Sequence, residues 1–106
     1  MDEPVAALTN PEIQKLKTAA QRLKPILKIG KNGVTPQFIQ SLDAAFASHE
    51  LVKVRFDEFK DEKKILARDL ATKTGSHLIT VLGNVAVFYR RKVERGEGVI
   101  GSVSRL

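Results

Sequence analysis

The chain has 106 residues, enough for one domain with a single modest core. It has no cysteine, which excludes a disulfide framework, thiolate zinc sites and a cysteine nucleophile. No apolar run is as long as a membrane span, and the acidic start differs from a secretory signal, so we expect a cytoplasmic protein. The net charge of +6 favours a polyanionic partner.

The positive charge is concentrated in one part of the chain. The stretch between Lys15 and Leu42 contains six basic residues and no acidic one. The six are Lys15, Lys17, Arg22, Lys24, Lys28 and Lys31. Because a phosphate-binding surface needs focused positive charge, this stretch predicts the position of a nucleic-acid interface.

The first predicted element is a helix that follows a flexible arm of residues 1–9. Asn10 and Pro11 are typical of the N-cap and the first helical position, and apolar residues then recur at helical spacing. The helix is expected to end before Pro25. A short apolar strand, residues 26–29, follows it and is interrupted by Lys28.

A second helix and a second strand come next. Thr35 and Pro36 predict the start of a helix that runs to about His49, because its apolar residues lie on one face. Residues 51–56 alternate between apolar and polar side chains, which predicts a half-buried strand.

A cluster of four acidic residues lies in the segment 57–62, and its interpretation has two alternatives. We expect a loop leading into the N-terminal end of a third helix, where negative charge is favoured. Metal binding is the alternative, but the spacing does not match a calcium loop. The third helix is predicted to stop at Gly75.

The last predicted elements are two strands, residues 77–82 and 85–90, joined by Gly83 and Asn84 in a hairpin. The whole order predicts an α/β fold with a single mixed four-stranded sheet and three packed helices, in the order α-β-α-β-α-β-β. We expect parallel crossovers and only the last pair of strands antiparallel. The domain then covers residues 10–92, and residues 93–106 form a loosely ordered tail.

The stretch between the first strand and the second helix is the main candidate site. Gly30, Lys31, Asn32 and Gly33 form a G-x-x-G loop, in which the glycines can take positive φ and allow close approach of another backbone. The helix that follows presents N–H groups and partial positive charge, which suit a phosphate. The alternative is an ordinary strand-to-helix turn. The predicted topology puts this loop and the hairpin turn at one edge of the sheet, and residues 90–92 toward the opposite edge.

Four separated motifs carry a resemblance to a known family. They are RLKPILKIGKNGVT (residues 22–35), HELVKV (49–54), TG (74–75) and VLGNVAVFYR (81–90). In this order they resemble a CRM domain, specifically the stand-alone bacterial YhbY-type proteins. The resemblance implies an RNA-binding domain, with a fold akin to the C-terminal domain of bacterial initiation factor three and a loop comparable to that of KH domains. It also implies a role with precursors of the large ribosomal subunit, whereas plant relatives act in group II intron splicing.

We therefore expect a non-enzymatic, monomeric RNA-binding protein that acts on ribosomal RNA in large-subunit assembly, with no catalytic residue, metal, cofactor, membrane contact or small-molecule substrate. One of Phe88 and Tyr89 could stack on a base. The alternatives are an RNA-processing hydrolase and a general nucleic-acid-binding protein; a missing metal constellation and acid–base pair disfavour the first. The candidate RNA-binding residues are Lys15, Arg22, Lys24, Lys28, Gly30, Lys31, Asn32, Gly33, Arg90, Arg91 and Lys92.

Overall fold

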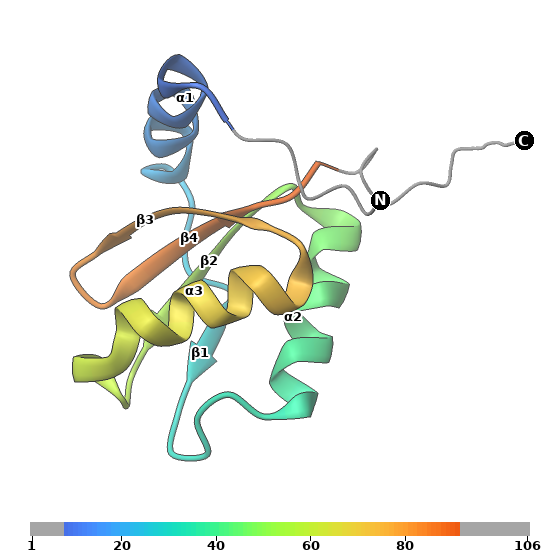
Figure 1. Ribbon diagram of the computed structural model, residues 1–106, viewed down its shortest axis with the longest axis vertical. Helices are drawn as coiled ribbons and strands as arrows, with labels where there is room; N and C mark the ends of the chain where they lie inside the picture. Colours follow the sequence, from blue (N-terminus) through green and yellow to red (C-terminus); the bar gives the residue numbers. More distant parts are fainter. Residues whose placement is uncertain (1–7, 92–106) are drawn as a thin grey trace, which may run out of the picture.

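The computed structural model describes residues 8–91, in which a four-stranded mixed sheet carries helices on both faces (Figure 1). Residues 1–7 of the expected arm, Lys92 and the expected tail lie outside the described residues. The order of helices and strands is the predicted one. The elements are α1 (Asn10–Ala20), β1 (Leu27–Ile29), α2 (Pro36–Ser48), β2 (Leu51–Phe56), the short 3-10 turn η1 (Lys60–Glu62), α3 (Lys63–Thr74), β3 (His77–Leu82) and β4 (Val85–Tyr89).

Helix α1 begins one residue earlier than the sequence predicted, because its N-cap is Thr9. The Thr9 hydroxyl accepts a hydrogen bond from the Glu12 backbone N–H at 3.3 Å, and the Glu12 carboxylate accepts from the Thr9 N–H at 2.8 Å. This reciprocal pair is a capping box, which satisfies two N–H groups at the helix start. The assignment of Asn10 as N-cap was therefore wrong, whereas the helix ends before Pro25 as predicted, at Ala20.

The predictions for α2 and for the end of α3 are confirmed. The Thr35 hydroxyl caps α2 by accepting from the Phe38 N–H at 3.0 Å. Gly75 ends α3 with a positive φ of 64°, which costs glycine little because it has no Cβ.

The strand order β1-β2-β4-β3 differs from the expected topology. Strand β1 is parallel to β2, as predicted, but β4 lies between β2 and β3 and is antiparallel to both. The prediction that only the last pair would be antiparallel was wrong. The reason lies in the packing of β4, where Ala86, Val87 and Phe88 are all buried, as in a central strand that is covered on both faces.

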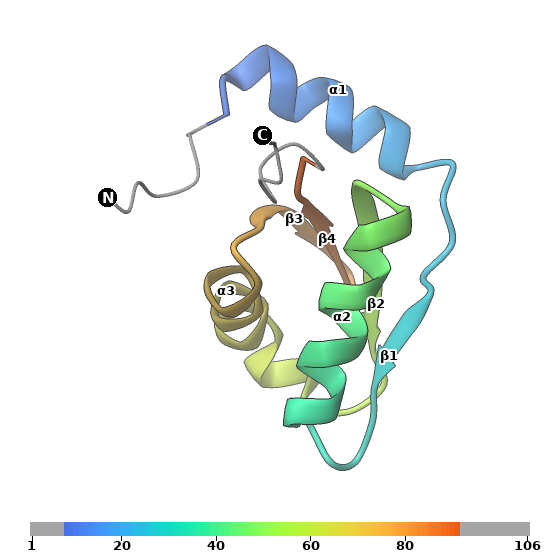
Figure 2. The same cartoon turned by 90° about the vertical axis from the view of Figure 1, so that its right-hand side faces the viewer.

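The two faces of the sheet have separate cores. Helices α2 and α3 cover one face, where Phe46, Phe56 and Phe88 are fully buried. Helix α1 covers part of the other face, where Ala20 packs with Ile79 and Val87. Figure 2 shows α1 across one end of the molecule, away from α2 and α3. Within residues 8–91, no helix has the length and apolar character that crossing a membrane requires.

The parallel strands β1, β2 and β3 end at the same edge of the sheet, as predicted. At this edge the Phe56 N–H donates to the Asn84 carbonyl at 2.7 Å, and the Asp57 N–H donates to the Ile29 carbonyl at 3.0 Å. At the opposite edge, the Arg90 N–H donates to the Glu50 carbonyl at 2.9 Å. The G-x-x-G loop and Arg90 therefore lie at opposite ends of the strands.

Candidate nucleic-acid interface

The GKNG loop (Gly30, Lys31, Asn32 and Gly33) is a tight turn at the end of β1. The Gly33 N–H donates to the Gly30 carbonyl at 3.0 Å, and Lys31 and Asn32 are exposed at the tip. Of the two glycines in the loop, only Gly33 has a positive φ, which is 68°. A Cβ at Gly30 would have no neighbour within 4 Å, so Gly30 leaves open space at the surface of the turn.

The start of α2 offers an incoming anion fewer donors than the sequence suggested. Pro36, at the beginning of the helix, has no N–H, and the Phe38 N–H already donates to Thr35. At most the Gln37 amide of the first turn is left for a ligand. The charge of Lys31 and the helix dipole therefore carry more of any attraction for phosphate than a nest of amides would.

The acidic segment after β2 lies beside the GKNG loop, an arrangement that the sequence analysis missed. A Cβ built on Gly33 would lie 3.3 Å from the Phe59 ring, and Phe59 itself has a left-handed φ of 58°. A surface hollow of about 610 Å³ is lined by Lys31, Asp57, Glu58, Phe59, Lys60, Asp61 and Glu62. The parallel pairing of β1 with β2 brings these segments together, so the charge around Lys31 is mixed.

One carboxylate of the acidic segment is held by a cation of its own. Arg55 Nε donates to Asp57 Oδ1 at 2.7 Å, and this hydrogen bond is the main reason that the pKa of Asp57 is lowered. Lys28 and Lys60 lower it further through their charge. Asp57 therefore stays ionised at neutral pH and offsets part of the positive charge near the loop.

The backbone of the basic segment (residues 15–31), which carries the six cations, follows one side of the molecule. Figure 2 shows this segment running from α1 through β1 to the GKNG loop. Lys15, Arg22, Lys24, Lys28 and Lys31 are exposed, and Lys17 is half-buried. Across the part of the chain that the structure describes, none of the six forms an ion pair.

Other cations are held by partners within the protein. Arg55 pairs with Asp57, and Lys73 with Asp69 at 2.9 Å. Lys53 Nζ donates to the carbonyls of Ala20, at 3.0 Å, and Leu23, at 2.9 Å. Lys63 Nζ donates to Asn84 Oδ1 at 3.2 Å. Among residues 8–91, the cationic side chains of the basic segment have no such partner, and Lys60, Lys64 and Arg68 share this property.

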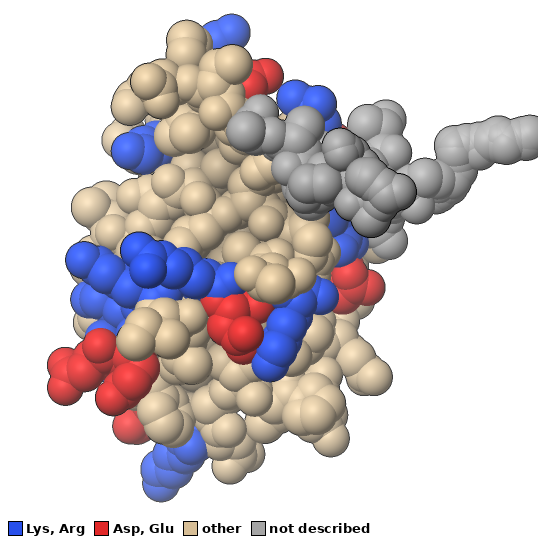
Figure 3. All heavy atoms as spheres, viewed as in Figure 1, with Lys and Arg blue, Asp and Glu red and all other residues tan. Residues whose placement is uncertain are grey.

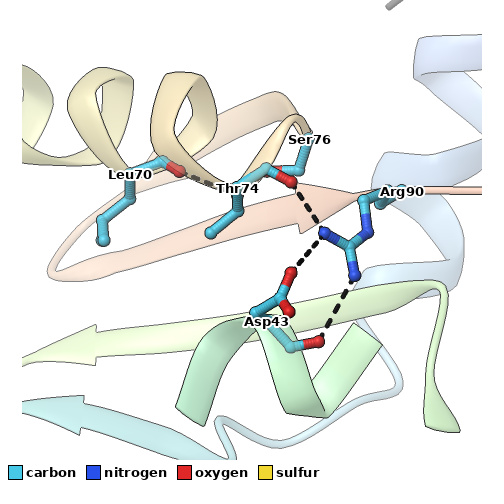
Figure 4. Close-up of polar contacts among 5 residues, drawn as sticks. All are labelled: Asp43, Leu70, Thr74, Ser76 and Arg90. Atoms are coloured by element: carbon cyan, nitrogen blue, oxygen red, sulfur yellow. Dashed lines mark hydrogen bonds and ion pairs between the residues drawn. The ribbon is translucent and has the colours of Figure 1, made fainter. Parts of the chain in front are cut away.

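Arg90, a candidate RNA-binding residue, is only 8% exposed, and its side chain makes its contacts within the protein (Figure 4). Its Nη1 donates to Asp43 Oδ1 and to the Thr74 carbonyl, both at 2.7 Å, and its Nη2 donates to the Asp43 carbonyl at 3.3 Å. The guanidinium also lies over the Phe46 ring, 4.7 Å from its centroid. Arg90 therefore ties α2 and the end of α3 to β4, and its polar atoms point into the protein.

Arg91 is half-buried and pairs with Glu12 at 3.4 Å, which links the end of β4 to α1. Lys92 lies outside the described residues. The structure therefore brings Arg90 and Arg91 together at the edge of the sheet opposite the GKNG loop, and it gives both of them internal contacts.

The aromatic residues of β4 also have internal roles. Phe88 is fully buried in the core beneath α2 and α3. Tyr89 is half-buried, packs against the core beneath α1, and has its ring centroid 6.0 Å from that of His77. Of Phe88 and Tyr89, only Tyr89 has exposed ring surface that is available for stacking on a base.

Helix α3 carries cations that the sequence analysis did not single out. Lys64 and Arg68 are exposed and spaced four residues apart, which puts them on one helix face. Figure 3 shows Lys and Arg side chains gathered along α3, with acidic side chains next to them. The i, i+4 spacing was the signal that could have found this pair.

The described residues contain no group of three or more His, Cys, Asp or Glu side chains that could hold a metal ion. The acidic segment 57–62 therefore does not assemble into the metal site that was the alternative interpretation.

Comparisons with known proteins agree with this architecture. Residues 8–90 match the CRS1 / YhbY (CRM) domain. The chain is 29% identical over 100 residues to Probable RNA-binding protein PA4753 of Pseudomonas aeruginosa, across 93% of this chain and 95% of that protein. It is 31% identical over 88 residues to Probable RNA-binding protein YqeI of Bacillus subtilis, across 82% and 92% respectively. The solution structure of the hypothetical protein SAV1595 from Staphylococcus aureus is similar with a TM-score of 0.71 and 34% identity, over 90% of this chain and 100% of that one.

Proposed function

The chain belongs to the CRS1 / YhbY (CRM) domain family, and from this we propose that it is a non-enzymatic RNA-binding protein. Its relatives in Pseudomonas aeruginosa and Bacillus subtilis are each named "Probable RNA-binding protein". The proposed contacts are the basic segment and the GKNG loop, which would hold the phosphate backbone as the RNA passes along this side of the molecule.

One observation carries the proposal: within the described residues the six cations of the basic segment have no internal ion pairs and no acidic residue lies among them in the chain, whereas Arg55, Lys73, Arg90 and Arg91 are paired. An unpaired surface cation can neutralise a phosphate without first breaking a contact in the protein. Binding then gains free energy as the counterions of the RNA are released. Phosphate contacts of this kind position the RNA without reading its sequence.

The structure also guides which predicted site residues enter the proposal. Lys15, Arg22, Lys24, Lys28 and the four residues of the GKNG loop are retained, and Lys17 is added because it belongs to the same segment. Arg90 and Arg91 are assigned instead to the stability of the domain, since their guanidinium groups already have protein partners. Lys92 remains a candidate.

We further propose that the bound RNA is ribosomal and belongs to precursors of the large subunit, that the protein acts in the cytoplasm, and that it binds as a monomer. The resemblance to stand-alone bacterial YhbY-type proteins supports the ribosomal target. Crosslinking in cells followed by sequencing of the attached RNA tests this assignment directly. Messenger RNA or transfer RNA as the dominant crosslinked species would contradict it.

The test of the interface compares two triple variants that remove the same charge from different surfaces. Arg22→Ala/Lys24→Ala/Lys28→Ala removes three cations of the basic segment, and Lys64→Ala/Arg68→Ala/Lys73→Ala removes three cations along α3. We expect the first variant to bind structured RNA more than tenfold more weakly, about 1.4 kcal/mol, and the second to lose much less. Equal losses would mean that net charge, and no particular surface, determines binding.

The same assay separates binding from cleavage. Labelled structured RNA is incubated with the protein and a divalent metal ion, and its length and mobility are followed together. A mobility shift that disappears at high salt, with the RNA intact, supports a binding protein. Cleavage would favour the hydrolase alternative. Competition with duplex DNA tests the alternative of a general nucleic-acid-binding protein.

A further inference from the structure

The face of the sheet that carries α1 is covered only in part. The strand register places Lys28 opposite Arg55, Arg55 opposite Val85, and Val85 opposite Leu82. These four side chains form a row across the sheet on the face opposite α2 and α3, because directly paired residues point to the same face. Leu82 is 73% exposed, an unusual exposure for a large apolar side chain in a strand.

A groove lies between this row and the last turn of α1. It has a volume of about 350 Å³, with Leu82, Val85 and Val87 from the hairpin on its sheet side. Lys17, Ala20 and Gln21 line it from the side of α1, and Lys53 and Thr80 complete it. The groove therefore combines an apolar floor with a polar and basic wall.

The wall of the groove is fixed by Lys53. Its Nζ donates to the Ala20 carbonyl, which also accepts from the Leu23 N–H, and to the Leu23 carbonyl just beyond the end of α1. At the other end of α1, Arg91 pairs with Glu12. Because α1 is attached to the sheet at both ends, the groove is present before any ligand arrives.

The charges around the floor indicate what can occupy the groove. Lys17 lies on one side of the floor, and Lys28 and Arg55 continue the row on the other side. Asp57 forms an ion pair with Arg55 and also acts on Lys28 through its charge, so these two cations are only partly offset. An occupant should therefore offer apolar surface to the floor and negative charge to both sides. Unpaired nucleotides have this combination, since the faces of the bases are apolar and the phosphates follow at regular intervals along the chain. Bases within a duplex are stacked and cannot reach a floor of this kind.

We propose that unpaired nucleotides of the RNA lie in this groove, with bases or sugars against Leu82, Val85 and Val87 and phosphates beside Lys17 and Lys28. The inference rests on the proposed function and deepens it, because it makes single-stranded RNA the preferred ligand. Two of its cations, Lys17 and Lys28, belong to the basic segment, so one RNA strand can contact both surfaces.

The test uses two single variants that introduce the same charge at equally exposed apolar positions. Leu82→Glu changes the apolar end of the row, on strand β3, and Ile65→Glu changes a residue that is 69% exposed on α3. We expect Leu82→Glu to weaken binding of a twelve-nucleotide oligouridylate at least fivefold and Ile65→Glu to weaken it less than twofold. Binding of a fully paired RNA hairpin should be affected equally by the two variants. Thermal unfolding followed by circular dichroism confirms that both variants fold.

Methyl NMR of the wild-type protein provides a measurement that does not depend on a variant. Addition of the oligouridylate should shift the methyl signals of Leu82, Val85 and Val87 and leave those of Ile65 in place. If the wild-type protein binds RNA but these signals do not move and Leu82→Glu behaves as Ile65→Glu, this inference is wrong and the proposed function stands. If an acidic peptide shifts them and RNA does not, the groove is a protein-docking site and the inference is likewise wrong. If the wild-type protein binds no RNA at all, the proposed function itself fails.

Discussion

The Phe59 ring lies against Gly33, so that a Cβ added to this glycine would be 3.3 Å from Phe59 Cε2. Both residues have unusual backbone angles, with φ of 68° at Gly33 and 58° at Phe59. Left-handed backbone is strained for a non-glycine residue and persists only where the surroundings enforce it. The GKNG loop is therefore shaped by the acidic segment that follows β2 as well as by its own sequence.

Gly33→Val should destabilise the protein, whereas Gly30→Ala should not. Valine at position 33 combines a β-branched side chain with positive φ and a contact with the Phe59 ring, which we expect to cost roughly 1–3 kcal/mol. Alanine at position 30 has open space and should change stability by less than about 0.5 kcal/mol. Urea denaturation gives both values. Similar losses in the two variants would show that the backbone at Gly33 is not the constraint.

Lys31→Asp/Asn32→Asp should separate the charge of the GKNG loop from its geometry. Both residues are exposed and both glycines are kept, so stability should change by no more than about 0.5 kcal/mol. RNA affinity should fall more than tenfold, because two carboxylates would join the acidic residues already beside the loop and repel phosphate. The matched control is Lys31→Ala/Asn32→Ala, which should lose less RNA affinity than the double aspartate variant. Wild-type affinity in a folded double aspartate would make the loop a structural turn only.

Arg90→Ala should reduce stability far more than Arg91→Ala. Removing Arg90 leaves the Thr74 carbonyl without its charged donor and removes the cation over Phe46, and we expect a cost of roughly 2–3 kcal/mol. The Arg91 pair with Glu12 is partly exposed and longer, so its loss should cost less than about 1 kcal/mol. Chemical denaturation measures the difference. RNA affinity, measured where Arg90→Ala is still folded, should stay near the wild-type value.

RNA binding should weaken steeply as salt is added. When the logarithm of the binding constant is plotted against the logarithm of the salt concentration, each phosphate neutralised on a single strand contributes about −0.7 to the slope. Four to six contacts therefore predict a slope of roughly −3 to −4. The Arg22→Ala/Lys24→Ala/Lys28→Ala variant should show a shallower slope, because up to three of these contacts are gone. Fluorescence anisotropy over a salt series measures both slopes. A slope near zero in the wild-type protein would refute the electrostatic interface.

The cap of α1 should make stability depend on pH through Glu12. Its pKa is lowered from the ordinary 4.5, first by the hydrogen bond from the Thr9 backbone N–H, then by the one from the Thr9 hydroxyl and by the charge of Arg91. A carboxylate whose pKa is lower in the folded than in the unfolded protein stabilises the fold at pH values above its unfolded-state pKa. This contribution is lost as the pH falls through the folded-state pKa. Unfolding by urea between pH 7 and pH 3 should therefore show a smaller loss for Glu12→Gln than for the wild-type protein. Equal losses of stability in the two proteins would mean that this cap does not contribute to the pH dependence of unfolding.

Local signals in the sequence were sufficient to predict the helices and strands and several of the residues at which they begin or end. Thr35 and Pro36 predicted the start of α2, Gly75 predicted the end of α3, and Gly83 with Asn84 predicted the hairpin. Each of these signals depends on hydrogen bonds or backbone angles within a few residues, so it can be read without knowledge of the fold. The charge of the basic segment and the exposure of the GKNG loop tip were predictable for the same reason.

The tertiary structure decided which of the charged residues are available to a ligand. Arg90 and Asp43 are 47 positions apart in the chain, and only the packing of β4 against α2 shows that this arginine is buried. The acidic neighbours of Lys31 and the groove beside Leu82 likewise depend on the order of the strands. Strand order follows from which faces are buried once all helices are in place, a balance of long-range packing that no short stretch of sequence contains. The sequence by itself thus determined the elements and the basic segment, and the fold determined which of the described cations pair internally and which do not.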